Sequence, residues 1–278
     1  MSLYRHRALS RHPEHQYLDL LEHLVDREVR ETRNDTATRS VFGLRMEFDI
    51  GRWGFPMLTT KRLPFRVIAG ELIWFLSGSS NAKDLEDQGI NIWREWGDPE
   101  TRELGPVYGK QWRSWAAPDD RTIDQIAGVL DSLRKEPYGR RHLVSAWNPA
   151  DIQDMALPPC HVLFQLYVED DARLSLQIYQ RSADAFLGLP FNIASYALLL
   201  SMFARVLGRA PGTLIWVGGD VHLYGNHVEQ AQQQVLREPR DFPELFLQPK
   251  PDMNHWTLED MTLRDYAPWP HIAGEVSA

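Results

Sequence analysis

Apolar and polar positions follow two different periods along this chain. Residues 16–30 place apolar side chains three and four positions apart, a spacing typical of one face of a helix. Residues 44–50 alternate apolar with charged side chains, which predicts a half-buried strand. Residues 67–76 are almost wholly apolar and predict a buried helix, although Glu71 lies within them. Residues 122–133 are amphipathic, so the first half of the chain predicts both helices and strands.

A β-hairpin is predicted in the middle of the chain. Residues 162–168 and 174–179 both alternate, and Asp170-Asp171 lies between them. The antiparallel return brings the end of the second strand back beside the start of the first. Cys160 lies just before the first strand and Arg181 just after the second, so we expect the thiol near the guanidinium.

The last third predicts an apolar helix, a short strand and a more polar helix. We assign these elements to residues 193–207, 214–217 and 222–235, with Gly218-Gly219 ending the strand. Helices and strands alternate without a regular βαβ rhythm. This order predicts an α+β fold, in which a single domain contains a mixed β-sheet layered with helices.

Length and composition fit one folded domain over residues 16–278. A hydrophobic share of 43% and a charged share of 24% are ordinary for a globular chain. Residues 1–15 are polar and lack the apolar centre of a secretion signal, so we interpret them as a loose N-terminal tail; the alternative is a short Arg-rich transit peptide. No apolar run approaches the roughly 20 residues that span a bilayer, so no membrane contact is expected.

Net charge and cysteine content limit the partners and the compartment. A net charge of −8 argues against DNA or broad nucleic-acid binding, which needs a basic face. It still allows a few focused arginines to capture one phosphate. A single cysteine excludes an internal disulfide and fits a reducing compartment, so we expect a cytoplasmic protein.

Cys160 and Glu71 are candidates for chemistry because of their surroundings. A thiolate near positive charge is a nucleophile, whereas a core cysteine acts only as a small apolar residue. Glu71 lies among apolar residues, where an unpaired carboxylate is costly. Burial would raise its pKa and suit it to proton transfer; the alternative is a charge at an exposed helix edge.

Four arginines are candidates for phosphate binding, because a guanidinium binds phosphate bidentately and keeps its charge. Arg140 and Arg141 are adjacent and precede a strand-like run, and neighbours on a strand point to opposite faces. They therefore lie on a bend, reach into a partner subunit, or are simply solvated. Arg33 and Arg181 complete the group.

An amide and several rings are candidates for binding a heterocycle. Asn192 opens the apolar helix, where it serves either as its N-cap or as a donor and acceptor for an amide edge. Trp93, Trp96 and Phe191 either line a flat pocket or belong to the core.

No metal site is predicted. His222 and His227 lie five residues apart, a poor spacing for one helix face, and one cysteine cannot complete a zinc cluster. Phosphate-binding P-loop and Gly-x-Gly-x-x-Gly motifs are also absent from the sequence.

Eight ordered runs together resemble the thymidylate synthase family, from about Gln16 to the C-terminus. They are Thr59–Arg62, Gly70–Leu76, Leu104–Trp112, Arg140-Arg141, Pro159–His161, Gln180–Ser182, Gly188–Tyr196 and Gly218–Tyr224. The resemblance implies a catalytic domain over residues 16–278 that transfers a one-carbon unit from 5,10-methylenetetrahydrofolate to dUMP, giving dTMP and dihydrofolate. It also implies a homodimer, in which Arg140 and Arg141 reach the partner's site.

The resemblance also implies a role for each matching residue. Cys160 would attack C6 of the uracil ring, and C5 would then accept the one-carbon unit. The residues implied in the chemistry are Cys160, Glu71, Tyr108, Asn192, Arg181 and Asp184. Those implied for dUMP are Arg33, Arg140, Arg141, Gln180, Arg181, Ser182, Asn192, His222 and Tyr224. Those implied for the folate are Trp93, Trp96, Leu157, Asp184, Gly188 and Phe191.

The sequence departs from the family pattern at three places. One is Leu63-Pro64-Phe65, where the family often has a His or an aromatic residue on the folate side. The phosphate loop, residues 33–38, lacks both of the usual glycines, and the C-terminus ends Gly274-Glu275-Val276-Ser277-Ala278. A C-terminus that closes poorly would admit water in place of hydride. That alternative gives 5-hydroxymethyl-dUMP and tetrahydrofolate, while Trp93 favours the synthase and Asn192 favours uracil over cytosine. A nucleotide- or RNA-binding regulator without turnover is a third reading.

Overall fold

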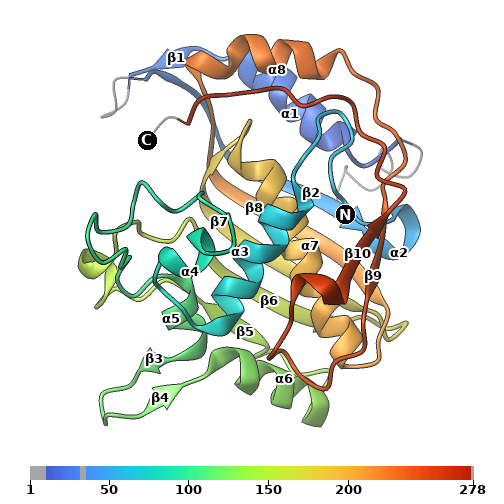
Figure 1. Ribbon diagram of the computed structural model, residues 1–278. Coiled ribbons are helices and arrows are strands. Elements are labelled where there is room, and N and C mark those ends of the chain that lie inside the picture. Colours follow the sequence, from blue (N-terminus) through green and yellow to red (C-terminus); the bar gives the residue numbers. More distant parts are fainter. Residues whose placement is uncertain (1–10, 32–35, 277–278) are drawn as a thin grey trace.

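The computed structural model describes residues 11–31 and 36–276 of the chain. Among them, six strands form one sheet in the order β1-β2-β8-β7-β6-β5, and α3 and α7 lie across one of its faces (Figure 1). The strands and their short hairpins are β1 (Val29–Arg30), β2 (Thr38–Asp49), β3 (Trp115–Ala116), β4 (Thr122–Ile123), β5 (Leu143–Ser145), β6 (His161–Val168), β7 (Leu174–Asp184), β8 (Pro211–Tyr224), β9 (Glu244–Leu247) and β10 (Met261–Arg264). The helices are α1 (His15–Val25), α2 (Ile50–Trp53), α3 (Phe65–Ser77), α4 (Lys83–Glu86), α5 (Tyr108–Arg113), α6 (Gln125–Lys135), α7 (Gly188–Val206) and α8 (Val228–Val235), with 3-10 turns η1 (Ile152–Asp154), η2 (Gly225–His227) and η3 (Leu258–Asp260).

The sheet is mixed, which confirms the predicted α+β class. β7 and β8 run parallel, while β2 pairs with β8, β6 with β7, and β5 with β6 in antiparallel register. The parallel pair needs a long crossover, and α7 supplies it between β7 and β8.

Three predicted helices form with shifted ends. The first, α1, stops at Val25 because Val29 and Arg30 pair instead with the edge of β2. The second, α3, extends to Ser77 and ends at Gly78, whose φ of 83° is the left-handed conformation typical of a helix C-terminus. The third, α6, starts only at Gln125, where the Asp124 side chain accepts the Ala127 N–H.

The prediction for the end of β8 was wrong. The strand does not stop at Gly218-Gly219 but continues to Tyr224, and the next helix, α8, begins at Val228. β8 is paired on both sides, with β2 and β7, along most of its length. The glycines allow close packing: a Cβ on Gly219 would lie 2.7 Å from the Arg181 carbonyl oxygen. His222 and Tyr224 are therefore strand residues.

The apolar helix α7 forms the centre of the core. By length and composition it is able to span a bilayer, contrary to the expectation that no run approaches that length, but 78% of its apolar window is buried inside the protein. It packs against β7 and β8, and both Phe203 of the helix and Trp216 of β8 are fully buried. The length of α7 thus reflects a core helix.

The packed part of the chain begins before residue 16. Pro13 and Glu14 are buried, and the His12 ring contacts those of Trp53 and Phe242 at 5.8 and 4.5 Å. The predicted N-terminal tail therefore overlaps the folded domain at residues 12–15. Residues 1–10 lie outside the described residues.

Two helix glycines make opposite stability predictions. A Cβ on Gly109 in α5 would lie 2.3 Å from the Ser79 carbonyl oxygen, whereas one on Gly128 in α6 meets open space. We expect Gly109→Ala to destabilise by about 2 kcal/mol or more through overpacking. Gly128→Ala should instead stabilise by about 0.5–1 kcal/mol through helix propensity. Urea unfolding of both variants tests this, and equal effects would refute the close contact.

Candidate active site

The β6–β7 hairpin brings the predicted nucleophile and a guanidinium together. The Arg181 backbone N–H donates to the Cys160 carbonyl oxygen at 2.9 Å. The guanidinium donates to the carbonyl oxygens of Pro159 (3.0 Å) and Pro158 (2.8 Å), and its Nη2 lies 4.0 Å from the Cys160 Sγ. The expected proximity of thiol and arginine is therefore confirmed, because two loop carbonyls hold the guanidinium in place.

The ionisation of Cys160 depends on two opposing effects. Burial raises the pKa of the thiol, and the positive charge of Arg181 opposes that rise. Loss of Arg181 would leave only the effect of burial and make the thiolate rarer. The same guanidinium lies 5.6 Å from the Trp147 ring centre, which is a contact that sequence reasoning missed.

Tyr108, the first residue of α5, fixes the start of β6. Its buried hydroxyl oxygen accepts the backbone N–H groups of Cys160 (2.8 Å) and His161 (3.3 Å). Burial raises the pKa of this phenol well above its ordinary value, so it stays neutral. Because the oxygen accepts both bonds, its own proton remains available for donation.

Glu71 enters the same region from α3. The indole Nε1–H of Trp93 donates to its Oε1 at 2.7 Å. Burial raises the pKa of Glu71 to about 7, and the bond from Trp93 opposes the rise. The Trp93 ring also lies 6.0 Å from both Tyr108 and Trp96. The structure thus favours the predicted desolvated carboxyl over an exposed helix-edge charge.

Asn192 is held by side chains and does not cap α7. The helix begins four residues earlier, at Gly188, so the N-cap alternative is wrong. The Asn192 Oδ1 accepts the Gln180 Nε2–H at 2.9 Å, and the Gln180 Oε1 accepts the Trp216 indole N–H at 2.9 Å. Burial lowers the pKa of His161 to about 4, and a hydrogen bond between the His161 and Asn192 side chains partly offsets this change. Gln180 is thus a partner of Asn192, and sequence reasoning missed His161.

The ends of β7 and β8 align four more predicted residues. Their parallel register pairs Ser182 with Asp220 and Asp184 with His222, while Tyr224 pairs with the start of β2. The His222 Nδ1 lies 3.0 Å from the Asp220 Oδ1, and its ring contacts that of Tyr224 at 5.1 Å. These polar groups therefore lie together at the end of β7 that also carries Arg181.

Three of the predicted folate residues, Asp184, Gly188 and Phe191, lie at the turn from β7 into α7 and in the first turn of that helix. The Asp184 Oδ1 accepts the backbone N–H groups of Phe186 (2.9 Å) and Leu187 (3.2 Å), which fixes the turn. A Cβ on Gly188 would lie 3.6 Å from the Asp184 Cβ. Leu157, Phe191 and Trp96 are partly buried against the core.

Two predicted arginines are not brought to this site within the described chain. Arg140 and Arg141 are exposed and precede β5, whose Leu143 pairs with Gln165. Gln165 lies five residues along from Cys160, or roughly 16 Å at the rise of a strand. Arg33 lies outside the described residues.

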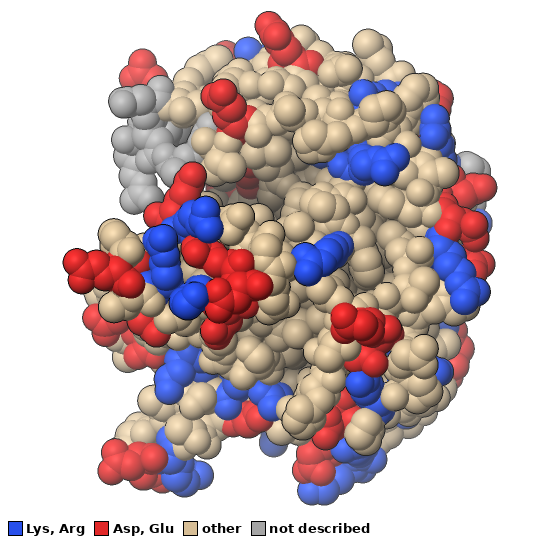
Figure 2. Space-filling model, in the orientation of Figure 1, with Lys and Arg blue, Asp and Glu red and all other residues tan. Residues whose placement is uncertain are grey.

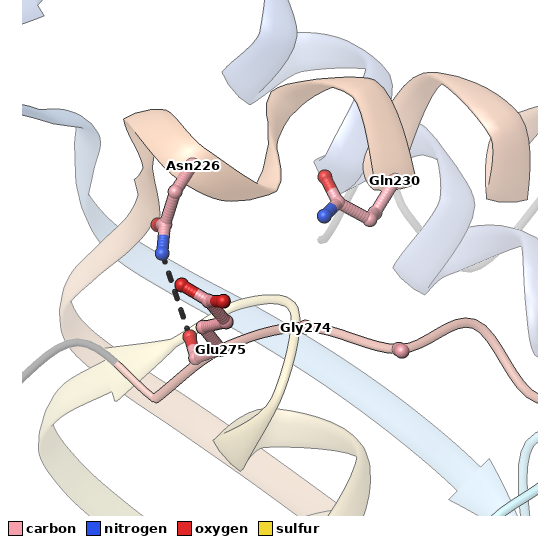
Figure 3. Close-up of a pocket in the computed structure, with 5 residues that line it drawn as sticks. Asn226, Gln230, Gly274 and Glu275 are labelled. Atoms are coloured by element: carbon pink, nitrogen blue, oxygen red, sulfur yellow. Dashed lines mark hydrogen bonds between the residues drawn. The ribbon is translucent and has the colours of Figure 1, made fainter.

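The C-terminal segment packs beside η2 and α8. The Glu275 carbonyl oxygen accepts from His227 Nε2 at 2.7 Å and from Asn226 Nδ2 at 3.5 Å, and Gln230 extends toward the same segment (Figure 3). A Cβ on Gly274 would lie only 3.0 Å from the Phe186 ring. The backbone of this unusual terminus, rather than the Glu275 side chain, makes these contacts.

Charges on the face shown in Figure 2 are mixed. Acidic and basic side chains gather together over α4 and the following loop, at the left of the view. They include the ion pairs Lys83–Asp87 (2.8 Å) and Arg94–Glu86 (3.3 Å). Such mixing does not form the basic stripe that nucleic acid requires. Within residues 11–31 and 36–276, no group of three or more His, Cys, Asp or Glu is placed to hold a metal ion.

A family model supplies the identification. The model described as thymidylate synthase matches residues 15–278. The chain belongs to the thymidylate synthase family. Members of this family are enzymes of one-carbon transfer that act on a pyrimidine nucleotide with a folate co-substrate. The thiol, carboxyl and amide described above belong to that catalytic domain.

Ionisation of Glu71 should be visible through Trp93. We expect the Trp93 indole N–H resonance to titrate with an apparent pKa of about 7 and to stop titrating in Glu71→Gln. Glu71 stays protonated to a higher pH in the folded chain than in the unfolded chain. Its contribution to the free energy of unfolding is therefore fully present below about pH 4.5 and is lost as the pH rises through about 7. NMR of the labelled indole checks the prediction, and a midpoint near 4.5 would contradict the desolvated environment.

Proposed function

We propose that this chain is a thymidylate synthase, which converts dUMP and 5,10-methylenetetrahydrofolate to dTMP and dihydrofolate. The observation that carries the proposal is the Cys160 thiol held 4.0 Å from the Arg181 guanidinium. Glu71, with a pKa of about 7, supplies a proton-transfer group near neutral pH. The family membership supports both substrates.

In the proposed reaction the Cys160 thiolate donates its electron pair to C6 of the uracil ring. The ring electrons move toward C5 and O4, so that C5 becomes the nucleophile for the one-carbon unit. Asn192, oriented by Gln180, holds the amide edge of the ring. Glu71 and Tyr108 move protons as the C5 proton departs and tetrahydrofolate leaves. Hydride from tetrahydrofolate completes the methyl group, and the thiolate is expelled from C6.

We also propose that two copies associate through the sheet face opposite α3 and α7. Directly paired residues share one face of a sheet, and one such row crosses five strands. That row is Leu143, Gln165, Gln177, Ile215 and Glu47. Leu143 is 42% exposed, and Tyr167, two residues along from Gln165, is 57% exposed. A partner on this face would explain the exposed apolar surface and let Arg140 and Arg141 reach its site.

The product decides between methyl and hydroxymethyl transfer. We expect dUMP and 5,10-methylenetetrahydrofolate to give a methyl-sized mass gain on the nucleotide together with dihydrofolate. The measurement combines mass spectrometry with the absorbance rise of dihydrofolate, and Cys160→Ser should abolish both signals. A hydroxymethyl-sized gain without dihydrofolate would contradict the synthase and support the alternative. Unchanged biological activity in Cys160→Ser would instead revive a regulator without turnover.

Mixing two inactive variants tests the shared site. One copy carries Cys160→Ser and the other carries Arg140→Ala with Arg141→Ala. Random exchange should restore about a quarter of the wild-type activity, because half of the dimers are mixed and each mixed dimer contains one intact site. Each variant alone should stay inactive under the same exchange conditions. No recovery in demonstrably mixed dimers would refute the role of these arginines in the partner's site.

A further inference from the structure

Glu14 is a buried carboxylate whose bonds all go to a distant loop. It stands at the N-cap position of α1, yet its side chain makes no capping bond there. Its Oε2 instead accepts the N–H (2.8 Å) and hydroxyl (2.6 Å) of Thr59, and its Oε1 accepts those of Thr60 (2.7 and 2.6 Å). The side chain is fully buried. Such complete satisfaction of both oxygens fixes the position of the Thr59-Thr60 backbone.

The residue after this loop reaches the turn that carries the predicted folate contacts. Lys61 is almost fully buried, and its Nζ donates to the Phe186 carbonyl oxygen and lies 3.6 Å from the Phe186 ring centre. Burial lowers the pKa of Lys61 to about 7, while the negative charge of Asp184 opposes that change. Lys61 therefore ties the loop to the segment between Asp184 and Gly188.

The same loop also binds the C-terminal segment, here at residues 266–269. The Tyr266 hydroxyl donates to the Leu58 carbonyl oxygen at 2.8 Å and accepts the Leu63 N–H at 3.0 Å. The Trp269 N–H donates to the Thr59 carbonyl oxygen at 2.7 Å. Residues 58–63, which we call the Thr-Thr-Lys loop, thus join three parts of the chain that are remote in sequence.

We infer that Glu14 is a positioning residue for the folate side of the site, acting through the Thr-Thr-Lys loop on the Asp184–Gly188 turn and on the C-terminal segment. The inference rests on the proposed function and deepens it. Glu14 makes no contact with Cys160, Arg181 or Asn192 among its hydrogen bonds. Its loss should therefore affect the folate more than the nucleotide.

The contact geometry explains why a carboxylate is required. The amide introduced by Glu14→Gln would present an NH₂ group where one oxygen now accepts a backbone N–H. A threonine hydroxyl can rotate to accept, but a backbone N–H cannot, so one buried donor would lose its partner. The substitution therefore disturbs the loop with almost no change in side-chain volume.

The test compares Glu14→Gln with a milder variant and a remote control. Thr60→Val removes one hydroxyl donor and keeps the carboxylate. Glu169→Gln changes a partly buried carboxylate that accepts from Ser175 at the opposite end of β6. Steady-state kinetics well below each unfolding temperature should give Glu14→Gln a KM for 5,10-methylenetetrahydrofolate about tenfold higher, with the KM for dUMP changed less than about twofold. Thr60→Val should show the same split to a smaller extent, and Glu169→Gln should show none.

Equal changes in both KM values, or a lowered unfolding temperature with unchanged kinetics, would overturn the inference and leave Glu14 a purely structural residue. If Glu14→Gln does not fold, the same comparison of KM values in Thr60→Val tests the inference instead. If the wild-type chain catalyses neither methyl nor hydroxymethyl transfer to dUMP, the proposed function is wrong, whatever the role of Glu14. Hydrogen exchange then decides on its own: faster exchange at residues 58–63 and 184–188 in Glu14→Gln, without change at residues 160–168, supports positioning, and uniform change refutes it.

Discussion

The antiparallel pairing of β6 with β7 is the constraint on which the site depends. It joins the Cys160 carbonyl to the Arg181 N–H, which places a guanidinium beside a thiol more than twenty residues away in sequence. The parallel pairing of β7 with β8 then adds Ser182, Asp220 and His222 at the same end. A site built on backbone hydrogen bonds tolerates side-chain change better than one built on loops, because the register itself fixes the geometry.

The parts of the fold that the sequence predicts are those with local causes. The hairpin follows from a period of two and a turn, and α3 and α7 follow from long apolar runs. The end of β8 was missed because its pairing partners on both sides are remote in sequence. The role of Asn192 as a helix cap was wrong for a local reason: Asp184 fixes the turn before Gly188, so the helix starts five residues before its expected start at residue 193.

The candidate site shows the same division between local and long-range causes. Glu71 is recognisable from sequence because a carboxyl in an apolar run must be desolvated or paired, and Trp93 supplies the pair. Lys61 and Glu14 lie in stretches that carry no such signal, and their burial arises only when the start of α1, the Thr-Thr-Lys loop and the turn before α7 pack together. Arg140 and Arg141 are recognisable as a pair in the sequence, but within one chain they are exposed and precede β5.

The charged side chains on the two sides of the candidate site are held in place by different kinds of contact. On the proposed nucleotide side, Arg181 is held by main-chain carbonyls and lies 4.0 Å from the Cys160 thiol, whose pKa it lowers. On the proposed folate side, Lys61 is held by the Phe186 carbonyl oxygen, and Glu14 by the N–H groups and hydroxyls of Thr59 and Thr60. Removing one partner of a buried charge leaves the other unsatisfied, which is more costly than losing a surface pair. The proposed folate side consequently depends on packing between remote parts of the chain, whereas the proposed nucleotide side depends mainly on the sheet.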